Sequence, residues 1–273
     1  MGPPAAEPKR SGLKLRLLSA AVLVPIVLLL VYLGAWPFAM LVAVASGIML
    51  FEWLQMLYRT GALPAGLAGL GMAIAVVLLG QGWPVAGFGM LALTGGVVWV
   101  IVSGPRRRWW IALGLVWIAL PCVALVWLRQ APDGGLAAVL WTLVMIWSAD
   151  TGAYFAGRGI GGPKLAPSIS PNKTWAGLVG GMLTAAVASV LFALVMGGQA
   201  LLTAALLAAL LAPWSQVGDL AESAIKRHVG VKDSGKLIPG HGGILDRVDA
   251  LLFAAPAVAL IAAVWPMGNL PWH

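Results

Sequence analysis

Long apolar runs, separated by short segments with charge, glycine or proline, follow one another along the whole chain. The length of each run is close to that of a helix that crosses a bilayer, which is about 20 residues. The nine runs are Leu17–Leu33, Pro37–Leu57, Pro64–Leu79, Pro84–Val102, Trp109–Leu128, Leu136–Phe155, Trp175–Met196, Leu201–Leu220 and Ala250–Pro266. They are apolar on all sides, whereas strands of a membrane barrel alternate polar and apolar positions. Because backbone groups inside a bilayer must be hydrogen-bonded within the protein, the runs predict helices.

The composition agrees with this pattern. Of the 273 residues, 61% are hydrophobic and 10% are charged, against about 45–50% apolar and about 25% charged in soluble domains. These proportions exclude a soluble globule and a disordered chain. The single cysteine, Cys122, excludes an intrachain disulfide, and its apolar run predicts burial. We therefore predict an all-α polytopic membrane protein with about nine transmembrane helices.

The basic residues predict an orientation. With nine spans, sixteen of the 17 Lys and Arg residues fall on one side and only Arg129 falls on the other. Since cytoplasmic loops collect bases, we expect a cytoplasmic N-terminus and an extracytoplasmic C-terminus. The bases before the first run resemble a signal peptide, but the long apolar stretch without a small-residue cleavage site predicts an uncleaved span. The bases are spread over five segments, so the sequence predicts no nucleic-acid binding.

Acidic residues divide the chain unequally. The N-terminal membrane half, residues 1–135 with spans one to five, contains Glu7, Glu52 and Asp133. The other half, residues 136–273 with spans six to nine, contains Asp150, Asp219, Glu222, Asp233, Asp246 and Asp249. Positive-inside bias explains bases but not acids. We therefore expect the chemistry in the second half, with cytoplasmic loops at residues 156–174 and 221–249.

The segment between the last two spans is the least membrane-like part of the chain. If the eighth helix continues, one of its faces carries Asp219, Glu222 or Ser223, and Lys226. Asp246 and Asp249, three residues apart, likewise share one face at the start of the ninth span. Carboxylates interleaved with bases suit a magnesium-bound phosphorylated substrate. Alternatively, acids at a helix start simply complement the helix dipole.

Glycines surround one histidine in this segment. Gly240, Gly242 and Gly243 flank His241, so backbone amides there could cradle a phosphate, although a flexible turn is the other interpretation. His228 and His273 have no comparable setting and are expected at the surface.

A second group of polar residues lies between Ser148 and Gly177. Asp150 ends an apolar run, and an ionisable residue there is a functional candidate, although an interfacial acid is the alternative. The segment contains a G-x-G-x-x-G match, but no strand precedes it and no βαβ unit follows, so a dinucleotide site is rejected. The Lys173-Thr174 pair lacks the glycines of a phosphate loop. What remains is a loop that presents Lys173.

Taken together, these motifs resemble the phosphatidate cytidylyltransferases, also called CDP-diacylglycerol synthases. The signature matches at Ser223, Ile225, Lys226, Arg227, Lys232, Asp233, Gly235, Ile238, Pro239, His241, Gly242, Gly243, Ile244, Asp246, Arg247, Val248 and Asp249. Segments 150–154, 170–175 and 216–220 are also similar to that family, while Ala176 stands where many members have Glu or Gln. The resemblance covers about residues 135–265.

The resemblance implies a reaction in which CTP and phosphatidic acid give CDP-diacylglycerol and pyrophosphate with Mg²⁺, at the cytoplasmic face of the inner membrane. It implies Mg²⁺ ligands at Asp219 and Asp246, with Asp249 as a further ligand or partner. Lys226 and Arg227 complete the catalytic set. The implied substrate-binding residues are Asp150, Lys173, Ser223, Lys232, Asp233, His241, Gly242, Gly243 and Arg247.

Two other functions stay open from the sequence. A transporter or flippase for phosphorylated lipids would place polar residues deep in several spans, whereas here the ionisable residues gather at one side. A CTP-dependent enzyme acting on another lipid, such as a polyprenol, is closer. The sequence also leaves open acyl-chain preference, dCTP use, a second cation and the oligomeric state, with a homodimer as one arrangement to test.

Overall fold

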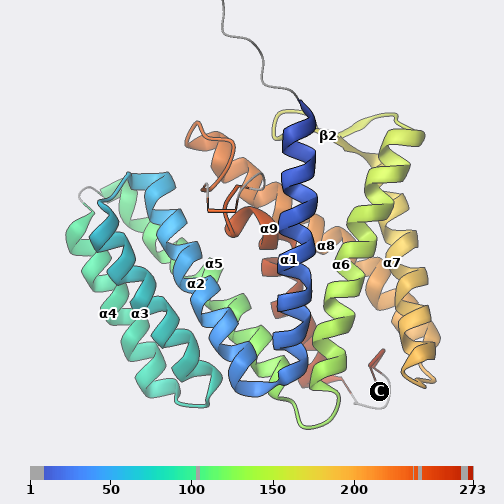
Figure 1. The fold of residues 1–273 in the computed structure, drawn as a ribbon, viewed down its shortest axis with the longest axis horizontal. Helices are drawn as coiled ribbons and strands as arrows, with labels where there is room; N and C mark the ends of the chain where they lie inside the picture. Colours follow the sequence, from blue (N-terminus) through green and yellow to red (C-terminus); the bar gives the residue numbers. More distant parts are fainter. Residues whose placement is uncertain (1–8, 103–104, 236, 239–241, 266–269, 273) are drawn as a thin grey trace, which may run out of the picture.

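The computed structural model describes residues 9–102, 105–235, 237–238, 242–265 and 270–272 (Figure 1). Of residues 9–18, 20, 35 and 105–108 it describes the backbone alone. The elements are α1 Lys9–Leu33, α2 Ala35–Tyr58, α3 Ala62–Gly80, α4 Pro84–Ile101, α5 Pro105–Gln130, α6 Gly135–Gly159, β1 Lys164–Ala166, β2 Ser170–Thr174, α7 Trp175–Val195, α8 Leu201–His228 and α9 Leu245–Val264.

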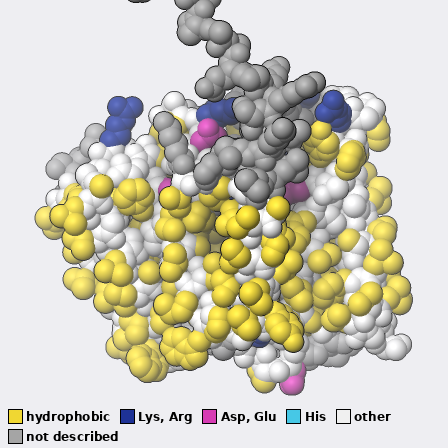
Figure 2. All heavy atoms as spheres, viewed as in Figure 1, with side chains coloured by type: hydrophobic (Ala, Val, Ile, Leu, Met, Phe, Trp, Pro, Cys, Tyr) yellow, Lys and Arg dark blue, Asp and Glu magenta, His cyan; other side chains and the backbone are white. Residues whose placement is uncertain are grey.

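The predicted all-α polytopic architecture is confirmed. Within the described ranges there are nine helices, and eight of them are long and apolar enough to cross a membrane. Helix α1 has a shorter apolar part, Ala21–Leu33, in the part of the chain that the structure describes. Hydrophobic side chains cover the middle of the face shown in Figure 2, and most of its visible Lys and Arg side chains lie near the upper end.

Element boundaries differ from the predicted ones around the two loops. Helix α8 continues to His228 and α9 begins at Leu245, so the loop expected over residues 221–249 narrows to residues 229–244. Both helices extend into polar sequence, because polar residues can continue a helix when their side chains find partners on neighbouring elements. A prediction from apolar runs alone does not include such polar turns. In the loop expected at 156–174, strands β1 and β2 form an antiparallel hairpin.

The helices pack as two groups joined through the centre of the molecule. Helix α3 packs against α2 and α4, and α7 packs between α6 and α8. Helix α5 contacts α2 and α9, so it connects the two groups, which occupy opposite sides of Figure 1. The α6–α7 contact is close because small residues meet there: a Cβ on Gly180 would collide with Ala156. The tight α6–α7–α8–α9 arrangement supports the polar residues described next.

Candidate active site

A buried ion cluster connects α8 with the start of α9. The Lys226 Nζ atom lies 3.0 Å from Glu222 Oε1 and 2.6 Å from Asp246 Oδ1. Glu222 is 0% exposed, Lys226 8% and Asp246 7%. Since Glu222 and Lys226 are four residues apart on α8, they share a helix face, and α9 brings Asp246 to the same point. The Lys226 ammonium group lies between two carboxylates, which offset much of the cost of burying its charge.

Asp246 also organises the loop between α8 and α9. Its Oδ2 atom accepts hydrogen bonds from the backbone N–H groups of Ser234, at 2.8 Å, and Gly243, at 2.9 Å. Gly242 adopts φ = 87°, a left-handed conformation that glycine permits, and its carbonyl accepts a hydrogen bond from the Ile238 N–H. Asp246 therefore holds both sides of the loop while it contacts Lys226.

A second, more open cluster surrounds Asp219 on α8. The Asp219 Oδ2 atom lies 2.6 Å from Lys173 Nζ, and Ser223 donates a hydrogen bond to Oδ1 at 3.3 Å. The Ser223 contact confirms that the helix continues and that the two residues share one face. Lys173 lies in strand β2 just before its last residue, Thr174, whose hydroxyl accepts a hydrogen bond from the Gly177 N–H and caps α7. This cap fixes where β2 delivers Lys173.

Three carboxylates approach one another beside this ion pair. Asp150 on α6, Asp219 on α8 and Asp249 on α9 are near enough to repel one another. Asp150 accepts a hydrogen bond from Gln216, and Asp249 accepts one from the Ala250 N–H. Carboxylate oxygens are the hard ligands that Mg²⁺ prefers, and a divalent cation would relieve the repulsion. The donor chemistry therefore fits Mg²⁺.

Among the described residues, no group of three acidic, His or Cys side chains is close enough together to hold a metal ion. In this arrangement both Asp246 oxygens already accept hydrogen bonds from the protein. Both Asp219 oxygens are engaged as well, by Ser223 and Lys173, but the Asp219 side chain is 29% exposed against 4% for Asp246, so Asp219 is the more accessible candidate. The assignment of Mg²⁺ to Asp219, Asp246 and Asp249 stays a prediction.

The remaining expected site residues lie around the two clusters. Arg227, Lys232, Asp233 and Arg247 are exposed, so their side chains are free to meet a soluble substrate. Arg227 donates to the Val231 carbonyl at 3.4 Å, the far limit of a hydrogen bond. Gly242 and Gly243 contact the Asp246 side of the loop, whereas His241 lies outside the described residues.

Three residues that the structure places at the site are absent from the predicted catalytic, substrate-binding and metal-binding residues. Glu222 completes the Lys226 cluster, Gln216 orients Asp150, and Glu52 on α2 contacts the α8–α9 loop. Glu222 lay on the predicted helix face, but its burial could not be known. Glu52 had a clear signal, because it is the one ionisable residue in the apolar run 37–57.

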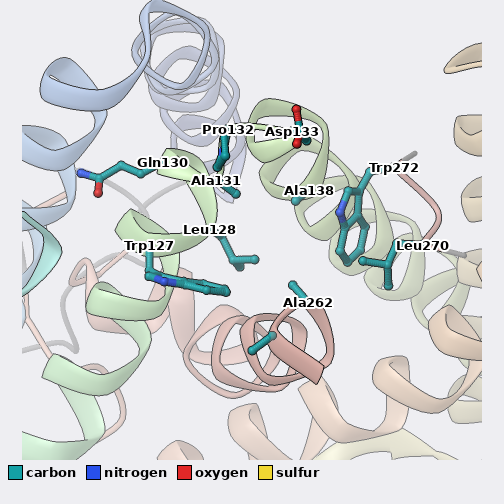
Figure 3. A pocket seen from close by; sticks show the side chains of 12 residues that line it. Trp127, Leu128, Gln130, Ala131, Pro132, Asp133, Ala138, Ala262, Leu270 and Trp272 are labelled. Carbon is teal, nitrogen blue, oxygen red and sulfur yellow. The ribbon is translucent and has the colours of Figure 1, made fainter. Parts of the chain in front are cut away.

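A cavity of about 400 Å³ lies at the other end of α9, among residues that include Trp127, Asp133, Ala262 and Trp272 (Figure 3). Ala262 is sixteen residues beyond Asp246, which corresponds to about 24 Å along a helix. The cavity is therefore separate from both ion clusters.

The fold is that of a polytopic membrane protein whose described helices hold two clusters of paired acids and bases. Residues 14–265 match the model of the cytidylyltransferase family, and the chain belongs to that family. The match extends the similarity beyond residues 135–265 into the N-terminal half.

Curated relatives support the same family assignment. The chain is 36% identical over 264 residues to the phosphatidate cytidylyltransferase of Brucella suis biovar 1 (strain 1330), covering 96% of this chain and 97% of that protein. It is 36% identical over 266 residues to the phosphatidate cytidylyltransferase of Bacillus subtilis (strain 168), covering 93% and 98%. The corresponding protein of Haemophilus influenzae (strain ATCC 51907 / DSM 11121 / KW20 / Rd) is 45% identical over 130 residues, covering 46% of this chain and 45% of that protein.

Proposed function

We propose that this protein transfers the cytidylyl group of CTP to phosphatidic acid, giving CDP-diacylglycerol and pyrophosphate for phospholipid biosynthesis. The observation that carries the proposal is the pairing of the buried Glu222–Lys226–Asp246 cluster with the open carboxylates around Asp219, at the end of apolar helices. Near-full-length relatives named phosphatidate cytidylyltransferase support it.

In this reaction a phosphate oxygen of phosphatidic acid attacks the α-phosphorus of CTP. A new P–O bond forms, the bond to the bridging oxygen breaks, and pyrophosphate leaves with that electron pair. Both reactants are anions, so catalysis consists mainly of neutralising charge and aligning the two groups. No protein nucleophile is needed.

The chain supplies bases at two depths for this task. Arg227 is exposed, where it can meet phosphate oxygens of the incoming nucleotide. Lys173 is half-buried beside Asp219 and can meet them once that ion pair opens. Arg227 offers a planar fork suited to two phosphate contacts. Lys226 lies deeper, and its two carboxylate partners keep its ammonium group charged and in a fixed position. The carboxylates of Asp219 and Asp249 would hold Mg²⁺, which would neutralise part of the phosphate charge.

The position in the bundle suits a reaction between a bilayer lipid and a soluble nucleotide. Asp219 and Asp249 belong to helices that qualify as membrane spans. Asp249 lies four residues after the start of α9, and Asp219 lies nine residues before the end of α8, in the half of the helix that adjoins the polar 229–244 loop. The lipid phosphate sits at this depth in a bilayer, whereas CTP arrives from water. We place this end at the cytoplasmic face of the inner membrane, because sixteen of the 17 bases are expected there.

The test is an assay of purified full-length protein in vesicles with Mg²⁺ and α-labelled CTP. Phosphatidic acid, diacylglycerol and a polyprenyl phosphate are offered separately as acceptors. We expect labelled CDP-diacylglycerol from phosphatidic acid alone, with pyrophosphate formed in equal amount. Labelled product from the polyprenyl phosphate alone would show that the enzyme acts on another lipid, and the proposed substrate would be wrong. Lipid movement across the vesicle membrane without CTP consumption would indicate a flippase.

A homodimer belongs to the same proposal and is tested separately. Mass measurement by light scattering in detergent, corrected for bound detergent, distinguishes one copy from two, since one chain has a mass of 28.3 kDa. A protein mass near 28 kDa at assay concentrations would remove the homodimer from the proposal.

A further inference from the structure

Glu52 is a carboxylate from the N-terminal half that reaches the loop of the candidate site. It lies on α2 and is 4% exposed. Its Oε1 atom accepts a hydrogen bond from the Ile244 N–H and its Oε2 atom accepts one from the Leu245 N–H, both at 3.0 Å. The Ser234 hydroxyl donates to Oε2 at 3.3 Å. Both oxygens of Glu52 therefore bind the segment that carries Asp246.

The loop is shaped to receive this carboxylate. A Cβ atom on Gly235 would lie 2.7 Å from Glu52 Oε1, and one on Gly243 would lie 2.5 Å from Oε2. Any side chain at these positions would collide with the carboxylate, because real Cβ contacts are longer. Two glycines thus leave space for Glu52 on opposite sides of the loop.

The charge of Glu52 is balanced by backbone rather than by a base. Of the ion pairs found among the described residues, none includes Glu52. Its partners are N–H groups at the start of α9, which lack acceptors within the helix and carry the positive end of the helix dipole. The carboxylate thereby fixes where α9 begins.

Asp246 and Glu52 hold the same loop from two sides. Ser234 gives its backbone N–H to Asp246 and its hydroxyl to Glu52. Gly243 gives its N–H to Asp246, and the next two N–H groups go to Glu52. Since Asp246 also binds Lys226, a displacement of the first turn of α9 would move Asp246, Asp249 and the Lys226 ammonium group together.

We infer that Glu52 is a positioning residue, which holds Ser234, Ile244 and Leu245 against α2 and so sets the geometry of Asp246, Asp249 and Lys226. Its hydrogen bonds go to Ser234, Ile244 and Leu245, so we expect it to act through the loop. For its effect on turnover this inference rests on the proposed cytidylyl transfer, whereas its effect on the segment can be measured without turnover.

The experiment compares Glu52→Gln with Ser46→Ala, a control at a buried α2 position whose hydroxyl donates to the Ala43 carbonyl of the same helix. Hydrogen–deuterium exchange of the full chain in lipid nanodiscs reports on the segment. A Gln side chain offers a single acceptor oxygen, so we expect the Ile244 and Leu245 amides to exchange at least about 10-fold faster, while α3 stays unchanged. A comparable change in Ser46→Ala, or acceleration spread over all helices, would overturn the positioning role.

Kinetics supply the second measurement. We expect kcat of Glu52→Gln to fall about 10–100-fold, with the KM for CTP within about threefold, because misplacing catalytic groups by about 1 Å has effects of this size. Wild-type kcat and wild-type exchange in Glu52→Gln would refute the inference. If the wild-type protein made no CDP-diacylglycerol but local exchange still rose, the proposed function would fail and the anchoring role would stand.

A pair of substitutions covers the case in which Glu52→Gln does not fold. Gly235→Ala collides only with Glu52 among its nearest atoms, so it should lower kcat in the native background and have less than a twofold effect when combined with Glu52→Ala. Ser234→Ala removes one contact to Oε2 and should raise exchange at residues 242–245 by about threefold. Full additivity of the first pair, or unchanged exchange in Ser234→Ala, would show that the carboxylate does not hold the loop.

Discussion

The substitution Asp246→Asn removes one charge from the buried cluster without changing the size of the side chain. Asp246 presents one oxygen to Lys226 and the other to two backbone N–H groups. An asparagine has one acceptor oxygen and one NH₂ group, so it cannot satisfy both sides. The less costly orientation keeps the oxygen on the two N–H groups and turns NH₂ toward the Lys226 ammonium group.

The magnitude follows from what that orientation loses. One charge-assisted hydrogen bond contributes about 1.5–3 kcal/mol, and Lys226 keeps its contact with Glu222 at 3.0 Å. We therefore expect the free energy of unfolding to fall by about 1.5–3 kcal/mol. For a chain of this size this corresponds to a decrease in melting temperature of about 3–12 °C. The protein should stay folded, but turnover should fall at least about 100-fold because Lys226 and the loop lose their shared anchor.

The assay pairs thermal unfolding in detergent with CDP-diacylglycerol formation at several Mg²⁺ concentrations. Asp133→Asn is the matched control, since Asp133 is exposed at the far end of the bundle, and it should leave both quantities unchanged. If Asp246→Asn keeps the wild-type melting temperature, turnover and Mg²⁺ dependence, both the anchoring role and the metal assignment of Asp246 are wrong.

Three further predictions follow from the same geometry. Arg227→Lys should lower kcat/KM about 10–100-fold, equivalent to about 1.4–2.8 kcal/mol, with normal expression, because a lysine cannot copy a bidentate phosphate contact; wild-type kinetics would leave Arg227 with a purely topological role. Lys173→Met should raise the KM for CTP and change the melting temperature little, because its ion pair with Asp219 is partly exposed; a large loss of stability with unchanged KM would contradict this. For topology, Lys232→Cys should react with a membrane-impermeant thiol reagent only from the cytoplasmic side, and Asp133→Cys only from the opposite side. Native Cys122 should not react because it is buried. The reverse labelling would refute the predicted nine-span orientation.

Local patterns in the sequence were sufficient for the helices and for part of the site. Apolar runs of membrane length give the helices, since burial of the backbone in lipid leaves few other structures. Helical spacing alone places Asp219 beside Ser223 and Glu222 beside Lys226, because residues four apart share a face. These relations depend on neighbours along one helix, so a linear pattern contains them.

Only the tertiary structure decided which helices meet and which charges are shared. Lys226 is buried between Glu222 and Asp246 because α9 packs on α8, and Glu52 reaches Ile244 across 192 positions because α2 lies beside the start of α9. Helix α9 begins at Leu245, whose N–H donates to that carboxylate, and the carboxylate charge complements the N–H groups of the first turn. Contacts between distant segments depend on complementary shape and charge in three dimensions, so the hydropathy pattern along the chain does not predict them.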